Sequence, residues 1–204
     1  MLNKLALLLL SSLSLFAMHN AEININQRDL EFALNLDMGQ YNTSVEPETT
    51  FMGVKYLKAS NNNSENEFNK EVNVKYFFEA NFLIKQKISD TGLKIGLGIK
   101  TNFSKVENNA FFAIPIGVDI SYRLPIKNFI PINVGGVVYY APESLSFSNA
   151  KSYLEYRAEV EAEVIERGSV FIGYRNLDTN YELGITRTDI TYNKSAYFGF
   201  KFAF

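Results

Sequence analysis

The sequence predicts an all-β fold, a transmembrane antiparallel up-and-down β-barrel, and three observations support this prediction. Apolar residues recur at every second position along most of the chain, which is typical of strands. Many alternating stretches approach about 9–12 residues, the length of a tilted strand that crosses a bilayer, whereas strands of soluble proteins average about five or six. Charged residues occupy many of the intervening positions, so the sheet has one apolar face and one charged face.

The N-terminus predicts a secretory signal peptide. Lys4 precedes an apolar run from Leu5 to Ala17, which is too short for a membrane-spanning helix. We expect the signal to cover residues 1–17, with cleavage as late as Ala21 left open, and residues 22–204 to form one barrel domain. The chain has no Cys, which excludes a lipid anchor and a disulfide framework. The net charge of −2 gives no indication of a nucleic-acid partner.

The alternating stretches are odd in number, whereas bacterial single-chain barrels use an even number of strands. They cover residues 30–38, 52–56, 72–80, 93–99, 112–122, 132–140, 154–164, 170–174 and 196–204. If the last strand ends in the periplasm, counting back closes a barrel of about eight strands with residues 51–58 and leaves residues 30–38 surplus. We prefer this count. About ten strands remain possible if Tyr181–Arg187 forms part of another strand.

The charged face indicates an inverted barrel, with apolar rows toward lipid and charges toward the interior. Acidic and basic residues are equally numerous on this face: Glu31, Asp37, Glu79, Asp119, Glu155, Glu159, Glu161 and Glu163 against Lys55, Lys75, Lys94, Lys100, Arg123, Arg157, Arg175 and Lys201. Because unpaired buried charge is costly, we expect these groups to pair. Inward glycines such as Gly98 and Gly117 would leave room for long side chains.

Aromatic residues near strand ends predict interfacial girdles: Phe51, Phe111, Tyr122, Phe129, Tyr139, Tyr140, Tyr153 and Tyr197. The connections sort by length. Residues 124–128 and 166–168 are short and would face the periplasm, whereas residues 61–67 and 178–194 are long and polar, as extracellular loops are.

The C-terminus and two internal motifs indicate a family. Residues 197–204 alternate aromatics and end in Phe204, which looks like the signal that barrels present to the outer-membrane assembly machinery, with Phe200, Phe202 and Phe204 as its residues. The stretch from Tyr139 to Ser146, followed downstream by Gly173-Tyr174-Arg175, resembles the YfaZ family of small outer-membrane proteins. The resemblance implies a small barrel behind a signal peptide, and it assigns no activity to any residue.

Nothing in the sequence predicts catalysis. His19 is the only histidine and lies beside the cleavage point, so a Ser-His-Asp site lacks a base, and the usual His/Cys zinc sites are absent. We expect no enzyme, no cofactor and no bound metal. The predicted lumen charge network consists of Glu155, Arg157, Glu159, Glu161, Glu163, Arg175, Arg123, Lys94, Lys100 and Asp119.

The glutamate row on residues 155–163 leaves two functions open. If basic residues neutralise it, the lumen is filled and charge-paired, and the barrel has a structural or interaction role through extracellular loops. If it is solvated, it could select cations in a narrow, porin-like pore for small solutes. We prefer the first. The expected location is the outer membrane of a Gram-negative cell, with outer-membrane lipid, lipopolysaccharide and the assembly machinery as partners, no nucleic acid, and an unknown loop ligand.

Overall fold

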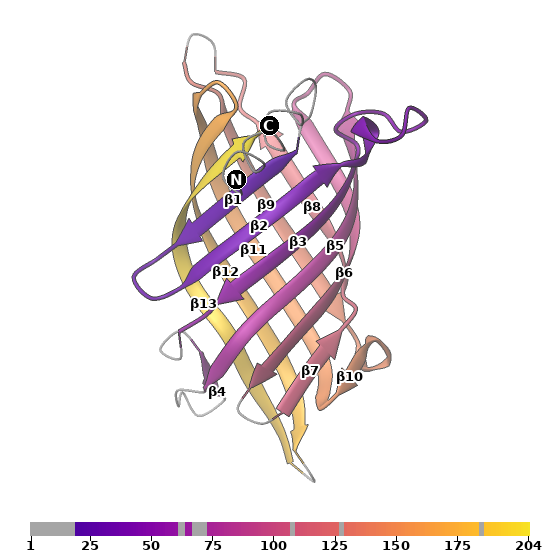
Figure 1. Ribbon diagram of the computed structural model, residues 1–204, viewed down its shortest axis with the longest axis vertical. Coiled ribbons are helices and arrows are strands. Elements are labelled where there is room, and N and C mark those ends of the chain that lie inside the picture. Colours follow the sequence, from indigo (N-terminus) through magenta and orange to yellow (C-terminus); the bar gives the residue numbers. More distant parts are fainter. Residues whose placement is uncertain (1–18, 61–63, 67–72, 107–108, 127–128, 184–185) are drawn as a thin grey trace, which may run out of the picture.

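The computed structural model describes residues 19–204 except 61–63, 67–72, 107–108, 127–128 and 184–185. The predicted signal peptide and the Asn61–Asn63 loop lie outside the described residues, as does the side chain of Lys75. The described part forms an elongated barrel of tilted strands (Figure 1), and its first and last strands pair with Asn20 opposite Ala203 at one end of the barrel. We call this the terminus end and the opposite one the distal end.

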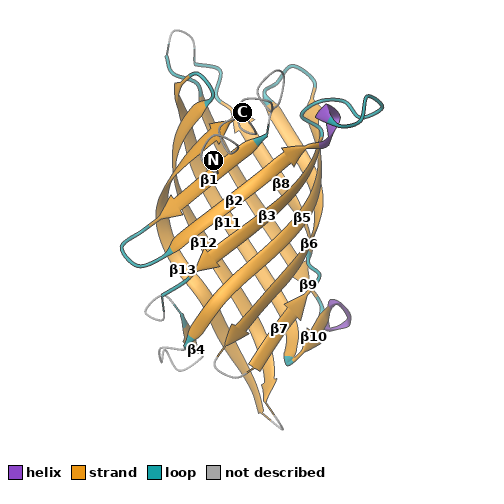
Figure 2. Cartoon of the chain, viewed as in Figure 1, coloured by secondary structure: helices purple, strands orange, loops and turns teal. Residues whose placement is uncertain are grey.

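Strands dominate the fold, as Figure 2 shows, and in the described residues short 3₁₀ turns occur at η1 (Met38–Gln40) and η3 (Glu143–Leu145). The strands are β1 (Asn20–Ile25), β2 (Leu30–Asp37), β3 (Thr50–Lys58), β4 (Glu65–Asn66), β5 (Val74–Ile88), β6 (Leu93–Val106), β7 (Asn109–Ala113), β8 (Ile116–Arg123), β9 (Ile132–Ala141), β10 (Ser146–Ser148), β11 (Ala150–Ile165), β12 (Gly168–Leu183) and β13 (Thr186–Ala203).

Ten antiparallel strands close the barrel, so the preferred count of eight is wrong. The ring runs β1-β2-β3-β5-β6-β8-β9-β11-β12-β13, and β13 pairs with β1 to close it. Strand β7 continues along β6 beyond β8, β10 pairs with β7, and the short β4 pairs with β13.

The error in the strand count has two causes. The predicted stretch 30–38 is not surplus, because Leu30–Asp37 is the strand β2, which pairs with β1 and β3. The remaining strand is β1, directly after the predicted signal, where no strand was expected. Tyr181–Arg187 is not a further strand, because its described residues form the tip of the β12–β13 hairpin.

The apolar rows face outward and the charged rows inward, as the inverted arrangement requires. Large apolar side chains on the outer wall are exposed, among them Leu97 (66%), Ile172 (62%) and Phe198 (49%). Charged side chains of the opposite rows are buried, including Glu31 and Glu155 at 0%. A soluble protein would have the reverse distribution, since it buries its large apolar residues.

The ends of the barrel differ in their connections. The described parts of the connections after β8 and after β11 lie at the terminus end, together with the loop between β2 and β3, because the adjoining strand ends, such as Gly168 opposite Phe202, are near the C-terminus. The predicted long loop 178–194 is wrong, because Asp178 pairs with Thr191 and the ladder continues to Leu183 opposite Thr186. This segment is a regular hairpin that projects beyond the other strands at the distal end (Figure 1). Its polar residues hide the alternation that a strand requires.

Candidate functional site

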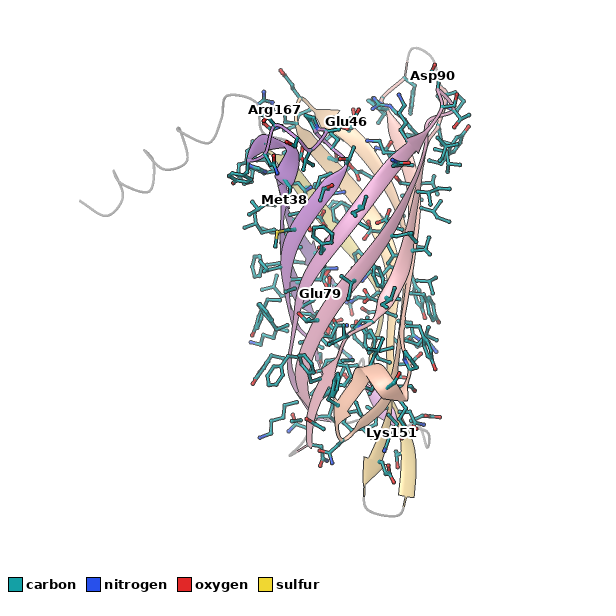
Figure 3. All side chains as sticks on the ribbon, turned by 90° about the vertical axis from the view of Figure 1, so that its right-hand side faces the viewer. Met38, Glu46, Glu79, Asp90, Lys151 and Arg167 are labelled. Atoms are coloured by element: carbon teal, nitrogen blue, oxygen red, sulfur yellow. The ribbon has the colours of Figure 1, made fainter. Side chains whose placement is uncertain are left out.

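The residues of the predicted lumen network fall into two groups along the barrel axis. Lys100, Glu155, Arg157 and Arg175 are buried at mid-height. Figure 3 shows this level at Glu79, between the terminus end with Asp90 and Arg167 and the distal end with Lys151. The other network residues, namely Glu159, Glu161, Glu163, Asp119, Lys94 and Arg123, line a cavity on the terminus side.

Glu31 on β2 joins the two buried guanidinium groups. Its carboxylate accepts two hydrogen bonds from Arg157, with Nη1–Oε1 at 2.8 Å and Nη2–Oε2 at 3.1 Å. Arg175 Nη1 lies 3.0 Å from Glu31 Oε2, and Asn24 Nδ2 donates to Glu31 Oε1 at 2.7 Å. Charge-assisted and bidentate contacts of this kind are stronger and more directional than neutral hydrogen bonds. Glu31 therefore ties β2 to β1, β11 and β12 through the barrel interior.

Asp29 lies in the turn between β1 and β2 and points inward, where it is buried. Its Oδ2 atom is 3.4 Å from Arg175 Nη2 and accepts a hydrogen bond from Asn193 Nδ2 at 3.0 Å. Its Oδ1 atom accepts from the backbone N–H of Ser60 at 2.7 Å. This turn residue therefore fixes the β1–β2 hairpin to β12, β13 and the segment after β3.

On the other side of Arg157, ion pairs continue toward β3. Arg157 Nε donates to Glu155 Oε1 at 2.7 Å, and Lys100 Nζ donates to Glu155 Oε2 at 2.8 Å. Lys100 Nζ also donates to Glu79 Oε2 at 3.1 Å. Lys55 Nζ lies 3.7 Å from Glu79 Oε1. The interior is thus crossed by ion pairs that link β3, β5, β6 and β11.

We call these groups the charge chain: in order, Lys55, Glu79, Lys100, Glu155, Arg157, Glu31, Arg175 and Asp29. The signs alternate along the chain, so every acid contacts at least one base. Buried charges require this balance, because an unpaired ion in the interior costs several kcal/mol. Lys100 Nζ also lies 3.9 Å from the ring centroid of Tyr139. An added Cβ atom would lie 2.2 Å from the Tyr139 hydroxyl at Gly98 and 2.5 Å from the Tyr139 ring at Gly117, so these glycines make room for this side chain.

The terminus side of the interior contains a cavity of about 680 Å³. Its charged lining groups are also largely paired: Lys201 Nζ is 2.7 Å from Glu161, Lys85 Nζ 2.8 Å from Asp119, Lys94 Nζ 3.0 Å from Glu48 and Arg123 Nη2 3.4 Å from Glu163. The Tyr197 hydroxyl donates to Glu159. The side chains of Lys94 and Arg123 are 40% and 55% exposed, so the cavity reaches the rim of the barrel.

The distal side of the interior is filled by a buried apolar and aromatic cluster, which we call the distal cluster. It comprises Leu57, Ala59, Val74, Phe77, Val106, Phe111, Ala113, Ala141, Ala150, Tyr153, Leu177, Tyr181, Ile190 and Tyr192. The ring centroids of Phe77 and Tyr192 are 5.4 Å apart, and those of Phe111 and Tyr153 are 5.5 Å apart. The Tyr153 hydroxyl donates to Glu155 at 3.1 Å, which joins the cluster to the charge chain.

Several aromatics predicted as interfacial girdles therefore have another position. Phe111, Tyr139, Tyr153 and Tyr197 are buried inside the barrel, and Phe51 lines the cavity. Only Tyr122, Phe129 and Tyr140 of the predicted set are exposed. An aromatic residue two positions from an inward charged residue on the same strand also points inward. On β11, Tyr153 points inward because Glu155 does. The sequence therefore contained the signal that places it inside.

The residues of the predicted assembly signal lie on β13 and just after it. Phe200 and Phe202 are exposed on the outer wall at 38% and 43%. Phe204 donates its backbone N–H to the carbonyl of His19 at 2.9 Å, and its ring packs edge-on against the imidazole of His19. His19 itself is buried, stacks on Tyr41 and accepts the backbone N–H of Asp37 at its Nδ1 atom. In the folded chain the last residue is thus held by the first described one.

Within the described ranges, no helix is long and apolar enough to cross a membrane. The same residues include no group of three or more His, Asp or Glu side chains arranged to hold a metal ion.

Comparison with known proteins gives one family match. The model of a family described as "YfaZ precursor" matches residues 1–204, which is the whole chain. None of the curated proteins compared with the chain matches it. The resemblance seen in residues 139–146 and 173–175 is confirmed by this match. With a closed antiparallel barrel and a family model that covers its full length, the chain belongs to the YfaZ family.

Proposed function

We propose that this YfaZ-family chain is a small outer-membrane β-barrel with a filled, charge-paired interior and a structural or interaction role through its distal loops. The observation that supports a closed interior is that the charge chain and the distal cluster follow each other along the barrel axis. We call them the two layers. The ring strands that contribute residues to the charge chain or the distal cluster are β2, β3, β5, β6, β9, β11, β12 and β13, so together the two span most of the cross-section. To pass through the barrel, an ion would have to separate the ion pairs of the charge chain and then displace the packed aromatic rings of the distal cluster.

Location in the outer membrane is supported by the outer wall. Exposed large apolar residues occur on every long strand, and in water such a surface would cause association or aggregation. On β11 the outward row from Leu154 to Val164 is apolar, which matches the outer band of about 25 Å in bacterial barrels. A closed barrel also leaves few backbone groups unpaired, as hydrocarbon requires.

A narrow, cation-leaning pore is the second candidate, and the cavity supports it. Ten strands enclose more space than the eight that side chains just fill, and the cavity of about 680 Å³ has Glu159, Glu161 and Glu163 on one wall. The proposal nevertheless favours the closed barrel, because Glu161 and Glu163 are paired and the distal cluster lies beyond. We further propose that the chain has no enzymatic activity, since His19, its only histidine, is engaged in packing at the chain ends.

Membrane insertion is tested by labelling single cysteines, which the Cys-free chain permits without background. Ile172→Cys places a thiol on the apolar outer wall, and Asp90→Cys places one in a fully exposed turn at the terminus end. After refolding into vesicles, a water-soluble maleimide should label position 90 from one side and leave position 172 unlabelled. Equal labelling at both positions would contradict insertion.

Closure is tested by single-channel recording of the refolded protein in a planar bilayer, with folding checked by heat-modifiable gel migration. We expect a silent membrane for the wild type and discrete openings for a Phe111→Ala/Tyr153→Ala variant, which removes two rings from the distal cluster. Glu163→Gln is the matched control and should remain silent, because its pair with Arg123 lies at the exposed rim. Openings of the wild type with cation preference would overturn the closed barrel and favour the pore.

A further inference from the structure

The barrel wall has an interruption beside β13. The β1–β2 hairpin is formed by strands of 6 and 8 residues, whereas β13 has 18. Pairing of β1 ends where Ile25 meets Phe198, and β4 begins to pair at Thr191. In the described part of the chain, the edge of β13 from Tyr192 to Tyr197 therefore has no strand partner on this side. Figure 1 shows the hairpin turning back beside β13 at mid-height.

The turn of the hairpin is held rigidly against this interruption. Asn26 N–H donates to the carbonyl of Asp29 at 3.2 Å, and the Asn26 side chain accepts the N–H groups of Arg28 and Asp29 at 2.8 Å each. Asp29 in turn is anchored in the charge chain. The side chains between these anchors, Gln27 and Arg28, are exposed. Arg28 therefore has a fixed backbone and a solvent-accessible guanidinium group.

A groove of about 460 Å³ lies along the interruption, lined by Asn26, Gln27, Arg28, Lys194, Ser195 and Ala196. Arg28 and Lys194 bring two positive charges to it, and among the described residues neither charge takes part in an ion pair. The carboxylate of Asp178 on β12 accepts hydrogen bonds from Asn176 and Thr191 and forms no ion pair with Arg28 or Lys194 among the described residues. The groove is thus a cationic site beside exposed apolar side chains of the wall.

Apolar side chains flank the groove on its terminus side. Ile25 and Phe198 are 47% and 49% exposed, and Ile23 and Phe200 follow at 45% and 38%. An anion with hydrocarbon chains would match both the cationic groove and the apolar side chains that flank it. The Tyr192 carbonyl at this edge accepts a hydrogen bond from Ser64 Oγ at 2.7 Å. In hydrocarbon, backbone groups of a strand edge that lack such a partner are costly, so a polar partner at this edge is favoured. Arg and Lys with a phosphate provide charge-assisted hydrogen bonds.

We propose that this groove binds an anionic, phosphate-bearing membrane lipid, with the phosphate between Arg28 and Lys194 and the acyl chains along Ile25 and Phe198. The inference rests on the proposed membrane location. It does not depend on whether the interior conducts, because the groove lies on the outer wall.

The chain contains no Trp, so a single introduced Trp reports on the lipid next to it. Phe198→Trp places the probe at the groove, and Phe103→Trp places a control on β6, which lies opposite β13 in the ring; these positions are 49% and 42% exposed. Each variant is reconstituted in phosphatidylcholine vesicles in which brominated phosphatidylcholine or brominated phosphatidylglycerol quenches the fluorescence. The ratio of quenching gives the lipid preference at each site.

At position 198 we expect a preference for phosphatidylglycerol of about fivefold, from two exposed charge contacts. Position 103 should show none. Adding Arg28→Gln and Lys194→Gln should abolish the preference at position 198, whereas Lys87→Gln with Arg123→Gln, which removes the same charge elsewhere, should preserve it.

Equal preference at both probes, or a preference that survives Arg28→Gln and Lys194→Gln, would overturn the inference. It would also be overturned if Trp at 198 is shielded from both lipids while Trp at 103 is quenched, because a protein partner would then cover the groove. Absence of quenching at both probes would instead overturn membrane insertion, and the inference with it.

Discussion

Replacing Glu31 by glutamine tests whether the charge chain stabilises the barrel. Glu31 is fully buried and accepts two hydrogen bonds from Arg157 and one from Asn24, with Arg175 at 3.0 Å. Glu31→Gln leaves two buried guanidinium groups to share the charges of Glu155 and Asp29. Removal of one partner from a buried ion pair costs about 3–5 kcal/mol. Because glutamine keeps one acceptor oxygen, we expect the lower part of this range, about 3 kcal/mol.

The assay is urea unfolding of the refolded protein in detergent micelles, followed by gel mobility. Glu163→Gln is the matched control, because it removes the same charge from an exposed pair with Arg123 at 3.4 Å and should cost about 0.5 kcal/mol or less. Glu31→Gln combined with Arg175→Gln restores the balance of signs, so its cost should be smaller than the sum of the single costs by about 1 kcal/mol or more. If Glu31→Gln costs no more than Glu163→Gln, the charge chain does not stabilise the fold.

Three further predictions concern the filled interior and the chain start. Phe111→Ala removes a fully buried ring and should lower the free energy of unfolding by about 3–5 kcal/mol in the same urea assay, and an unchanged midpoint would contradict a packed cluster. Gly117→Ala should cost about 1–3 kcal/mol, because its Cβ would lie 2.2 Å from a neighbouring carbonyl oxygen, whereas Gly136→Ala, with its nearest atom at 3.1 Å, should cost less; equal costs would refute the steric argument. Intact-mass measurement of the mature protein should show cleavage after Ala17, since cleavage after Ala21 would remove part of β1 and buried His19, and a mature chain that starts at position 22 would refute this.

The sequence predicted the wall of the barrel well because alternation is local. On β11, the outward apolar residues are exposed apart from half-buried Ala162, and each inward charged residue from Glu155 to Glu163 is buried or lines the cavity, as period-two counting requires. Lys100, Arg157 and Arg175 were placed on the inward face by the same argument. The inward and outward sides of a strand follow from its own sequence, so the order of strands in the ring need not be known.

Contacts across the interior could not be predicted, because they depend on the number and stagger of strands. Glu31 and Arg157 are separated by 126 residues, and their contact follows from a ten-strand ring that places β2 beside β1 rather than outside the barrel. Asp29 was missed because it lies in a turn, where alternation gives no inward or outward side. Strand β1 was missed because it has only six residues and directly follows the predicted cleavage region, although Ala21, Ile23 and Ile25 alternate with polar residues as in a strand.

Inward residues decide which part of a ten-strand ring is hollow. On the terminus side, inward positions carry small or polar residues such as Gly135, Glu159 and Glu161, and these residues line the cavity. On the distal side, large rings such as Phe77 and Tyr153 occupy inward positions and pack against each other, with their centroids 6.2 Å apart. The charge chain lies at the boundary, where one neighbour is a polar cavity and the other an apolar cluster. Because the apolar side cannot screen charge, each sign there needs a fixed partner, which explains why the chain alternates and why opening the barrel would require its rearrangement.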